Sequence, residues 1–186
     1  MRKNVLIIGC SSGIGYELLK IMLENEYKVY ACSRTAKTND NLSKLLDKYN
    51  NLYIDNIDVT NQNSIANTLK NVNNKLEKID LLVFNAGVYE VTSIDDFKVE
   101  DYEAMVNTNF LGAIRVTKEI LPYFEKQGYG KCLYNASLSS YFGLPYAGGY
   151  GSSKAGLVSF LESIQPQMRL KNIDIQVINH GFVKTR

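Results

Sequence analysis

Strand-like and helix-like segments alternate along this chain, and this alternation restricts the fold more than any other feature of the sequence. Apolar, β-rich runs occupy residues 3–8, 27–32, 51–57, 78–84, 131–136 and 173–178. Several are nearly continuous in Val, Ile, Leu and Tyr, as in strands that are buried on both faces. Segments with helical spacing lie between them and begin near Ile14, Asn39, Asn61, Val99 and Gly149. This order predicts an α/β fold with a doubly wound parallel sheet in three layers, α/β/α.

Length and charge restrict the remaining possibilities. The 186 residues suffice for one domain with a buried core, and we expect a single domain over residues 1–186. The net charge of +2, without a long basic block, does not favour a nucleic-acid partner. No apolar run reaches membrane length, so we expect a cytoplasmic protein without a membrane partner. Cys10, Cys32 and Cys132 lie in or beside apolar runs without metal-ligand spacing, which predicts buried thiols and no metal site.

A glycine-rich turn, GCSSGIG, follows the first strand directly. In a doubly wound sheet the ligand lies at the carboxyl ends of the strands, and this first turn is the usual cofactor position. Small residues let the backbone approach a pyrophosphate, whose charge the N–H groups and the helix dipole favour. The alternative is a tight glycine turn with nothing bound. The predicted cofactor contacts in this turn are Gly9, Ser11, Ser12, Gly13, Ile14 and Gly15.

The end of the second strand bears on the choice of nucleotide. An acidic residue there would bind the adenosine ribose and repel a 2′-phosphate. This strand instead ends in Ser33 and Arg34, and the Arg34 guanidinium could pair with a 2′-phosphate. A solvated loop arginine is the alternative. The sequence therefore predicts NADP(H) in preference to NAD(H), with NAD(H) still possible.

Tyr150 and Lys154 form a second candidate feature. Residues four apart share one face of a helix, so the phenol and the ammonium can converge on one ligand. A nearby cation can lower the pKa of a tyrosine towards the range useful for acid–base chemistry. Tyr16 and Lys20 have the same spacing in the first helical segment, and we interpret that pair as an accidental surface pair.

Other residues distinguish the Tyr150 pair from the Tyr16 pair. Ser137 ends the fifth strand thirteen residues before Tyr150, and strand ends of this architecture face the ligand crevice. The Asn-Ala-Gly sequence at residues 85–87 ends the fourth strand at the same edge. Asn109 lies in the long helical segment that should pass behind the site.

Taken in order, these motifs resemble the short-chain dehydrogenases/reductases, in the branch that consists of a single domain. The resemblance rests on Gly-x-x-x-Gly-x-Gly, the Asp58–Val59 pair, Asn-Ala-Gly, Asn109, Ser137 and Tyr150-x-x-x-Lys154, and it covers essentially the whole chain. It implies an NAD(P)-dependent oxidoreductase that transfers a hydride between nicotinamide and a small-molecule carbonyl or alcohol. The substrate itself does not follow from the fold.

The resemblance also implies four catalytic roles. Tyr150 would give a proton to a carbonyl oxygen or accept one from an alcohol. Lys154 would lower the pKa of Tyr150 and hold the nicotinamide ribose. Ser137 would hydrogen-bond the substrate oxygen, and Asn109 would hold a water that links Lys154 to solvent. For Ser137, a loop residue without a catalytic part is the alternative.

Further cofactor contacts are implied at the other strand ends. Asp58 and Val59 would border the adenine, and Asn85, Ala86 and Gly87 would line the cleft. The structural alternative for Asp58, Asn85 and Gly87 is helix capping or turn formation. Near the end of the chain, Gly181 and Thr185 match the family pattern, but His180 stands where the family has proline. We interpret His180 as a tolerated turn residue rather than a catalytic group.

The resemblance implies a further crossover, a seventh strand and a segment that closes over the substrate. None of these follows residue 186 in this sequence, so we expect a fragment of a longer protein. Relatives commonly assemble through the helices that carry Asn109 and Tyr150, which implies a homodimer or homotetramer. Two other functions stay open: an NADP(H)-binding sensor or scaffold without turnover, and a plain interaction domain that binds no cofactor.

Overall fold

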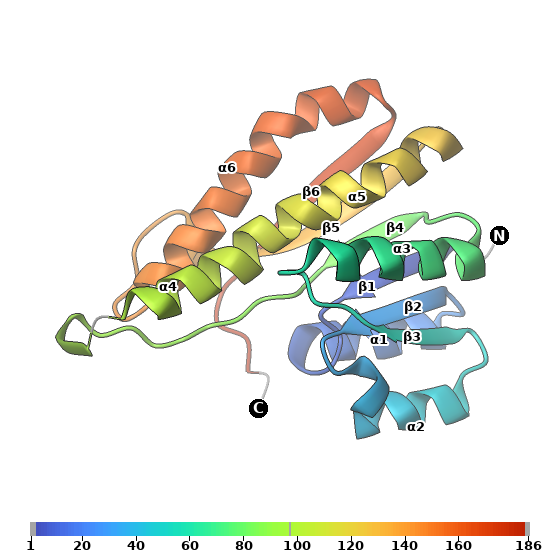
Figure 1. Ribbon diagram of the computed structural model, residues 1–186, viewed down its shortest axis with the longest axis horizontal. Helices are drawn as coiled ribbons and strands as arrows, with labels where there is room; N and C mark the ends of the chain where they lie inside the picture. The colour runs from blue at the N-terminus through green and yellow to red at the C-terminus, as the bar shows by residue number, and fades with distance from the viewer. Residues whose placement is uncertain (1–2, 97, 185–186) are drawn as a thin grey trace.

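A computed structural model describes residues 3–96 and 98–184 of the chain. They form a six-stranded parallel sheet with the strand order β3-β2-β1-β4-β5-β6 (Figure 1). The strands are β1 (Asn4–Ile8), β2 (Lys28–Ser33), β3 (Leu52–Asn56), β4 (Leu81–Phe84), β5 (Gly130–Ser137) and β6 (Ile173–His180). The predicted doubly wound α/β fold is therefore confirmed.

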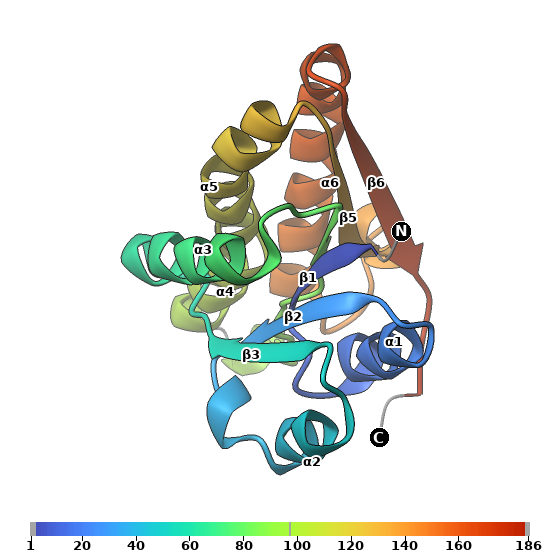
Figure 2. The same cartoon turned by 90° about the vertical axis from the view of Figure 1, so that its right-hand side faces the viewer.

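Helices cover both faces of the sheet. They are α1 (Gly13–Glu24), α2 (Asp40–Lys48), α3 (Gln62–Leu76), α4 (Val99–Met105), α5 (Gly112–Gln127) and α6 (Gly148–Leu170). Figure 2 shows α1 and α2 on one side of the sheet and α3, α5 and α6 on the other. The described part of the chain contains no helix that is both long enough and apolar enough to cross a membrane.

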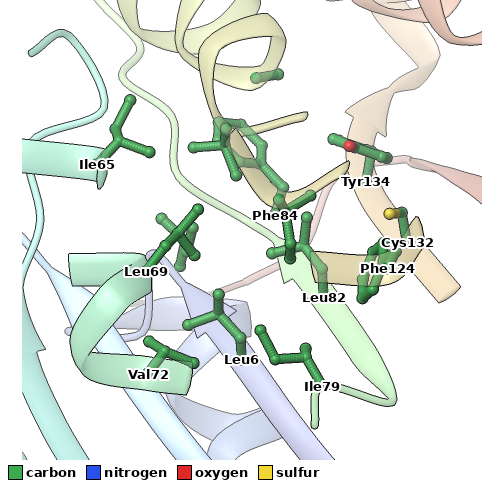
Figure 3. Packing of buried hydrophobic residues seen from close by; sticks show 14 of the residues in the cluster. Leu6, Ile65, Leu69, Val72, Ile79, Leu82, Phe84, Phe124, Cys132 and Tyr134 are labelled. Atoms are coloured by element: carbon green, nitrogen blue, oxygen red, sulfur yellow. The ribbon is translucent and has the colours of Figure 1, made fainter. Parts of the chain in front are cut away.

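The position of β1 inside the sheet explains why its sequence is apolar without alternation. Leu6 and Ile8 pack in the core below α3, α5 and α6, whereas Val5 and Ile7 pack in the second core below α1 and α2. All four side chains are fully buried. Figure 3 shows Leu6 packed among side chains from α3 and β4. A strand between two helical layers must be apolar on both faces.

Polar residues set the helix boundaries locally. Asn39 caps α2 by accepting a hydrogen bond from the N–H of Leu42, and Asn61 caps α3 in the same way through Ser64. Side chains of this kind satisfy N–H groups that have no partner within the helix. At the other end of α5, Gly128 adopts the left-handed conformation that a helix C-terminus often requires. Asn39 and Asn61 are the positions near which the sequence pattern predicted these two helices to start.

Two findings refine the sequence predictions. The long helical segment expected from Val99 is interrupted between α4 and α5 by a π-helical stretch, Val106–Leu111, which contains Asn109. The three cysteines are free and buried, as predicted, and burial raises the pKa of Cys10 and of Cys132 to about 12. Neither thiol is poised to react.

Candidate functional site

A cleft of about 420 Å³ opens at the carboxyl ends of β1, β2 and β4. The strand order reverses between β1 and β4, which is where a doubly wound sheet leaves a crevice. The lining residues are Ile8, Gly9, Ser11, Ser33, Arg34, Thr35, Ile57, Asp58, Val59, Thr60, Ala86, Gly87, Val88 and Thr108. The fold therefore places the cleft directly beside the glycine turn.

The glycine turn is packed tightly against the end of β4. Gly9 has a φ of +93°, and a side chain there would overlap the backbone of Ala86. A side chain at Gly15 would overlap the carbonyl of Gly9. Ser12 begins α1 without a side-chain cap, and the first turn contains no acidic residue. The N-terminus of α1 therefore keeps the exposed N–H groups and positive dipole that suit a phosphate.

The cofactor residues predicted in the glycine turn and at the ends of β2, β3 and β4 divide into two groups. Those that line the cleft are Gly9, Ser11, Arg34, Asp58, Val59, Ala86 and Gly87. Those that lie in the turn or the adjoining strand end without lining it are Ser12, Gly13, Ile14, Gly15 and Asn85. Sequence reasoning missed seven lining residues, most of which flank a predicted one: Ile8, Ser33, Thr35, Ile57, Thr60, Val88 and Thr108. Thr185 lies outside the described residues.

The far end of the cleft combines an arginine with an unsatisfied hydroxyl. Arg34 is exposed at the wall of the cleft, beside the buried Ser33. The Ser33 Oγ has no hydrogen-bond partner among the described residues, which is unusual for a buried hydroxyl. Asp58 forms a turn with Thr60, whose hydrogen bonds hold the pKa of the Asp58 carboxyl below its ordinary value, with a smaller contribution from Arg34.

Tyr150 lies in the first turn of α6, beyond the end of the cleft. Its ring meets Tyr89 edge to face, with ring centroids 5.2 Å apart. Burial raises the pKa of Tyr150, and a hydrogen bond with Ser137 opposes this rise without reversing it. The Lys154 Nζ lies 5.7 Å from the centre of the Tyr150 ring, over its face. The net direction of the Tyr150 pKa is therefore upward, with burial as the main cause, and not the lowering expected from a nearby Lys154.

Lys154 is almost completely buried, with 4% of the residue exposed. Its Nζ donates a hydrogen bond of 2.8 Å to the carbonyl of Asn135 on β5. Burial lowers the pKa of Lys154 to about 8, so the ammonium is retained at neutral pH at a cost in stability. A side chain at Gly87 would lie 3.6 Å from Nζ and 3.3 Å from the Asn109 Oδ1. The predicted residues Gly87, Asn109 and Lys154 are thus brought together.

Asn109 is buried in the π-helical stretch, and its side-chain amide is fully engaged. The Nδ2 donates to the Val88 carbonyl and to the Ser153 Oγ, and the Oδ1 accepts from the Val88 N–H at 2.8 Å. These bonds tie the end of β4 to α6. The side chain therefore has a clear structural part, whereas the expected water-holding role stays a prediction.

Ser137 ends β5 and faces the same region. Its Oγ accepts hydrogen bonds from the Ser139 N–H at 3.2 Å and from the Ser139 Oγ at 2.9 Å. Ser139 is buried and fixes the orientation of the Ser137 hydroxyl. Gly181 follows β6, and a side chain there would lie 3.4 Å from Leu138. The contact of Gly181 with Leu138 depends on the register of β5 with β6, which the sequence alone does not give.

A row of amide side chains joins the strand ends. The Asn85 Nδ2 donates to the Gly9 carbonyl at 2.6 Å. The Asn135 Nδ2 donates to the Asn85 Oδ1, and the Asn135 Oδ1 lies 3.3 Å from the His180 Nε2. Sequence reasoning missed Asn135, which has no recognisable spacing to either partner. Within residues 3–96 and 98–184, no group of three or more His, Cys, Asp or Glu side chains is placed to hold a metal ion.

Comparison with known proteins shows the family. The family model described as short chain dehydrogenase matches residues 3–186. An uncharacterised oxidoreductase of Bacillus subtilis, YusZ, is 34% identical over 187 residues, which cover 99% of this chain and 66% of that protein. The 3-oxoacyl-[acyl-carrier-protein] reductase FabG of Thermotoga maritima is 28% identical over 186 residues, with 98% and 75% covered.

Solved structures agree with the sequence comparison. The structure of ElxO with NADP bound superimposes with a TM-score of 0.93 at 29% identity and covers 100% of this chain and 76% of its own. The chain spans only part of its curated relatives: 66% of the Bacillus subtilis protein and 61% of an uncharacterised oxidoreductase of Schizosaccharomyces pombe, to which it is 29% identical.

Proposed function

Because the chain belongs to the short-chain dehydrogenase family, we propose that it is an NADP(H)-dependent oxidoreductase that interconverts a carbonyl and an alcohol. The observation that carries this proposal is that the cleft and the buried Lys154 ammonium lie next to each other at the carboxyl edge of the sheet. The cleft beside the glycine turn reaches Gly87, and the buried Lys154 ammonium lies immediately behind that residue. Tyr150 and Ser137 stand beside it, joined by a hydrogen bond.

NADP(H) fits the residues that form the cleft. Because Gly9 and Gly15 have no side chains, the turn can pack closely and still leave the start of α1 open to a pyrophosphate. Arg34 and the unsatisfied Ser33 hydroxyl would hold the 2′-phosphate, and no acidic side chain ends β2. The NADP in the ElxO structure supports this choice. We propose NADP(H) over NAD(H) on these grounds.

The nicotinamide, when bound, supplies or accepts the hydride. Burial keeps Tyr150 protonated at neutral pH, so its hydroxyl can donate the proton to a carbonyl oxygen during reduction. The Ser137 hydroxyl would stabilise the charge that develops on that oxygen. Lys154, charged at neutral pH, would stabilise the tyrosinate that remains and would hold the nicotinamide ribose. Asn109 would hold the water that links Lys154 to solvent.

The same proposal extends to the organisation of the protein. We propose that residues 1–186 form one dinucleotide-binding domain that takes a small-molecule substrate. Assembly as a homodimer or homotetramer and a cytoplasmic location remain predictions. Gel filtration with light scattering would decide the first, and microscopy of a tagged full-length protein would decide the second.

A fluorescence titration with NADPH and, separately, with NADH tests cofactor binding. We expect tight NADPH binding and weak NADH binding, and comparable dissociation constants would contradict the assignment of Arg34. Tyr150→Phe should then keep NADPH affinity but lose most turnover of a panel of ketones and aldehydes. Tyr16→Phe is the matched control, because Tyr16 and Lys20 have the same spacing in α1 and Tyr16 does not line the cleft. Binding without turnover in the wild type would favour the sensor instead.

A further inference from the structure

His180 is connected to the glycine turn of the cofactor cleft through the side chains of Asn135 and Asn85. It is the last residue of β6, is partly buried and lies in register with Ser137 on β5. Its Nε2 contacts the Oδ1 of Asn135, a side chain with 7% of its surface exposed. A proline at this position, as the family pattern has it, could offer Asn135 no donor.

The direction of each hydrogen bond in this row is fixed from one end. The Gly9 carbonyl can only accept, so the Asn85 amide must turn its Nδ2 towards it. The Asn85 Oδ1 then faces Asn135 and must receive that residue's Nδ2. The Asn135 Oδ1 is consequently left facing His180 and requires a donor. A neutral His180 ring must therefore carry its proton on Nε2.

We propose that His180 is a positioning residue of the cofactor cleft. Its Nε2–H holds the Asn135 side chain, which holds Asn85, which in turn keeps the glycine turn against the end of β4. The backbone carbonyl of the same Asn135 accepts the Lys154 ammonium, so the row ends beside the proposed catalytic lysine. This inference rests on the proposed function, and it gives His180 no part in proton transfer.

The role follows from the cost of leaving a buried acceptor unpaired. Without a donor at position 180, the Asn135 Oδ1 has no other hydrogen-bond partner among the described residues. An amide in that state gains from turning or shifting towards water, which would release Asn85. The glycine turn tolerates little movement, because Gly9 and Gly15 already pack against backbone atoms. Loss of the donor should therefore weaken cofactor binding before it affects chemistry.

The first test needs no cofactor. His180 is the only histidine of the chain, so the ring nitrogen signals of ¹⁵N-labelled histidine all come from one imidazole. We expect the neutral ring to be the Nε2–H tautomer, with a ring proton that stays visible because it is hydrogen-bonded. In Asn135→Ala that proton should exchange with water and disappear. In Asn179→Ala, a control whose side chain bonds Tyr141 instead, it should remain. An Nδ1–H tautomer, or an unchanged signal in Asn135→Ala, would refute the hydrogen-bond row.

The second test separates positioning from acid–base catalysis. His180→Phe keeps a flat ring but has no donor, and His180→Gln restores an N–H donor without a titrating ring. We expect His180→Phe to weaken NADPH binding by about threefold to tenfold, the equivalent of one hydrogen bond, and His180→Gln to recover most of it. At saturating NADPH, kcat should stay within about twofold of wild type in both.

The outcomes are distinguishable from failure of the proposed function. A wild-type chain that binds no NADPH overturns that function before any variant is compared, and it removes the positioning role with it. If wild type binds and His180→Phe binds equally well, the positioning role alone is wrong. An equal loss of kcat in both variants would assign His180 to proton transfer and would also overturn the proposal.

Discussion

Replacing Lys154 by methionine measures how much stability the buried ammonium costs. Burial lowers the pKa of Lys154 from 10.5 to about 8, and this difference corresponds to about 3 kcal/mol of unfavourable free energy for the charged form. Methionine has a similar length and no charge, so it removes that cost. It also removes the hydrogen bond to the Asn135 carbonyl, which is worth about 1 kcal/mol. We expect Lys154→Met to raise the free energy of unfolding by about 2 kcal/mol at neutral pH.

The sign of the pH dependence follows from the same pKa. Between about pH 8 and the ordinary lysine pKa, the unfolded chain keeps a proton that the native Lys154 has released. The wild type therefore gains stability as the pH rises through this range. Methionine cannot titrate, so its advantage is complete below about pH 8 and is lost towards pH ~10.5. Other ionisable groups are common to both proteins and cancel in the difference.

Urea unfolding at about pH 7 and about pH 10 provides the measurement. Lys118→Met, at an exposed lysine of α5, is the control and should change the free energy of unfolding by less than about 0.5 kcal/mol. A Lys154→Met protein that is less stable than wild type at neutral pH would refute the reasoning. So would a stability difference that does not change with pH. Under the proposed function Lys154→Met is also inactive, so the variant would be more stable than wild type but would have lost activity.

Three further changes test separate parts of the structure. Arg34→Ala should weaken NADPH binding by about 10-fold to 100-fold and leave NADH binding unchanged, because only a 2′-phosphate pairs with the guanidinium. An equal loss of affinity for the two nucleotides in the fluorescence titration would contradict this. Gly9→Ala should lower the free energy of unfolding by about 3 kcal/mol or more, since it combines a positive φ with overlap of the Ala86 backbone. The control is Gly143→Ala, where the added side chain meets no atom within 4 Å. It should change the free energy of unfolding by less than about 0.5 kcal/mol in the same urea experiment. Asn61→Ala should cost about 1 kcal/mol through the lost cap of α3, and an unchanged urea midpoint would show that water replaces the cap without cost.

The sequence was sufficient for features that depend on local pattern. Continuous apolar runs such as residues 4–8 predict strands buried on both faces, and Asn39 and Asn61 mark helix starts through their own backbone neighbours. The glycine turn was recognisable because its position after the first strand fixes its place in the fold. These signals lie within a few residues of the structure that they determine.

Other features depend on contacts between distant segments and could not be predicted. Asn135 acquires its partners only from the register of β5 with β4 and β6. The π-helical stretch that carries Asn109 has no sequence signature of its own. The direction of the Tyr150 pKa was wrong, because spacing to Lys154 indicates a possible neighbour but says nothing about how deeply the phenol is buried.

The central place of β1 in the sheet has a consequence for how the chain assembles. β1 is synthesised first, and β2 can pair with one of its edges after a short connection. Its other edge must wait for β4, since the hydrogen bond from the Asn4 N–H to Asp80 joins residues 76 positions apart. Closing so long a loop is entropically costly and slow.

Leu6 and Ile8 have no complete core to enter until α5 and α6 have emerged from the ribosome, and both helices follow β4 in the chain. The residues that precede β4 thus form a sheet in which one edge of β1 is unpaired and one apolar face is not yet covered by α5 and α6. Such an intermediate is the kind of surface that chaperones recognise and that aggregates when synthesis stalls. The strand that organises the finished domain is the one that its early folding leaves most exposed.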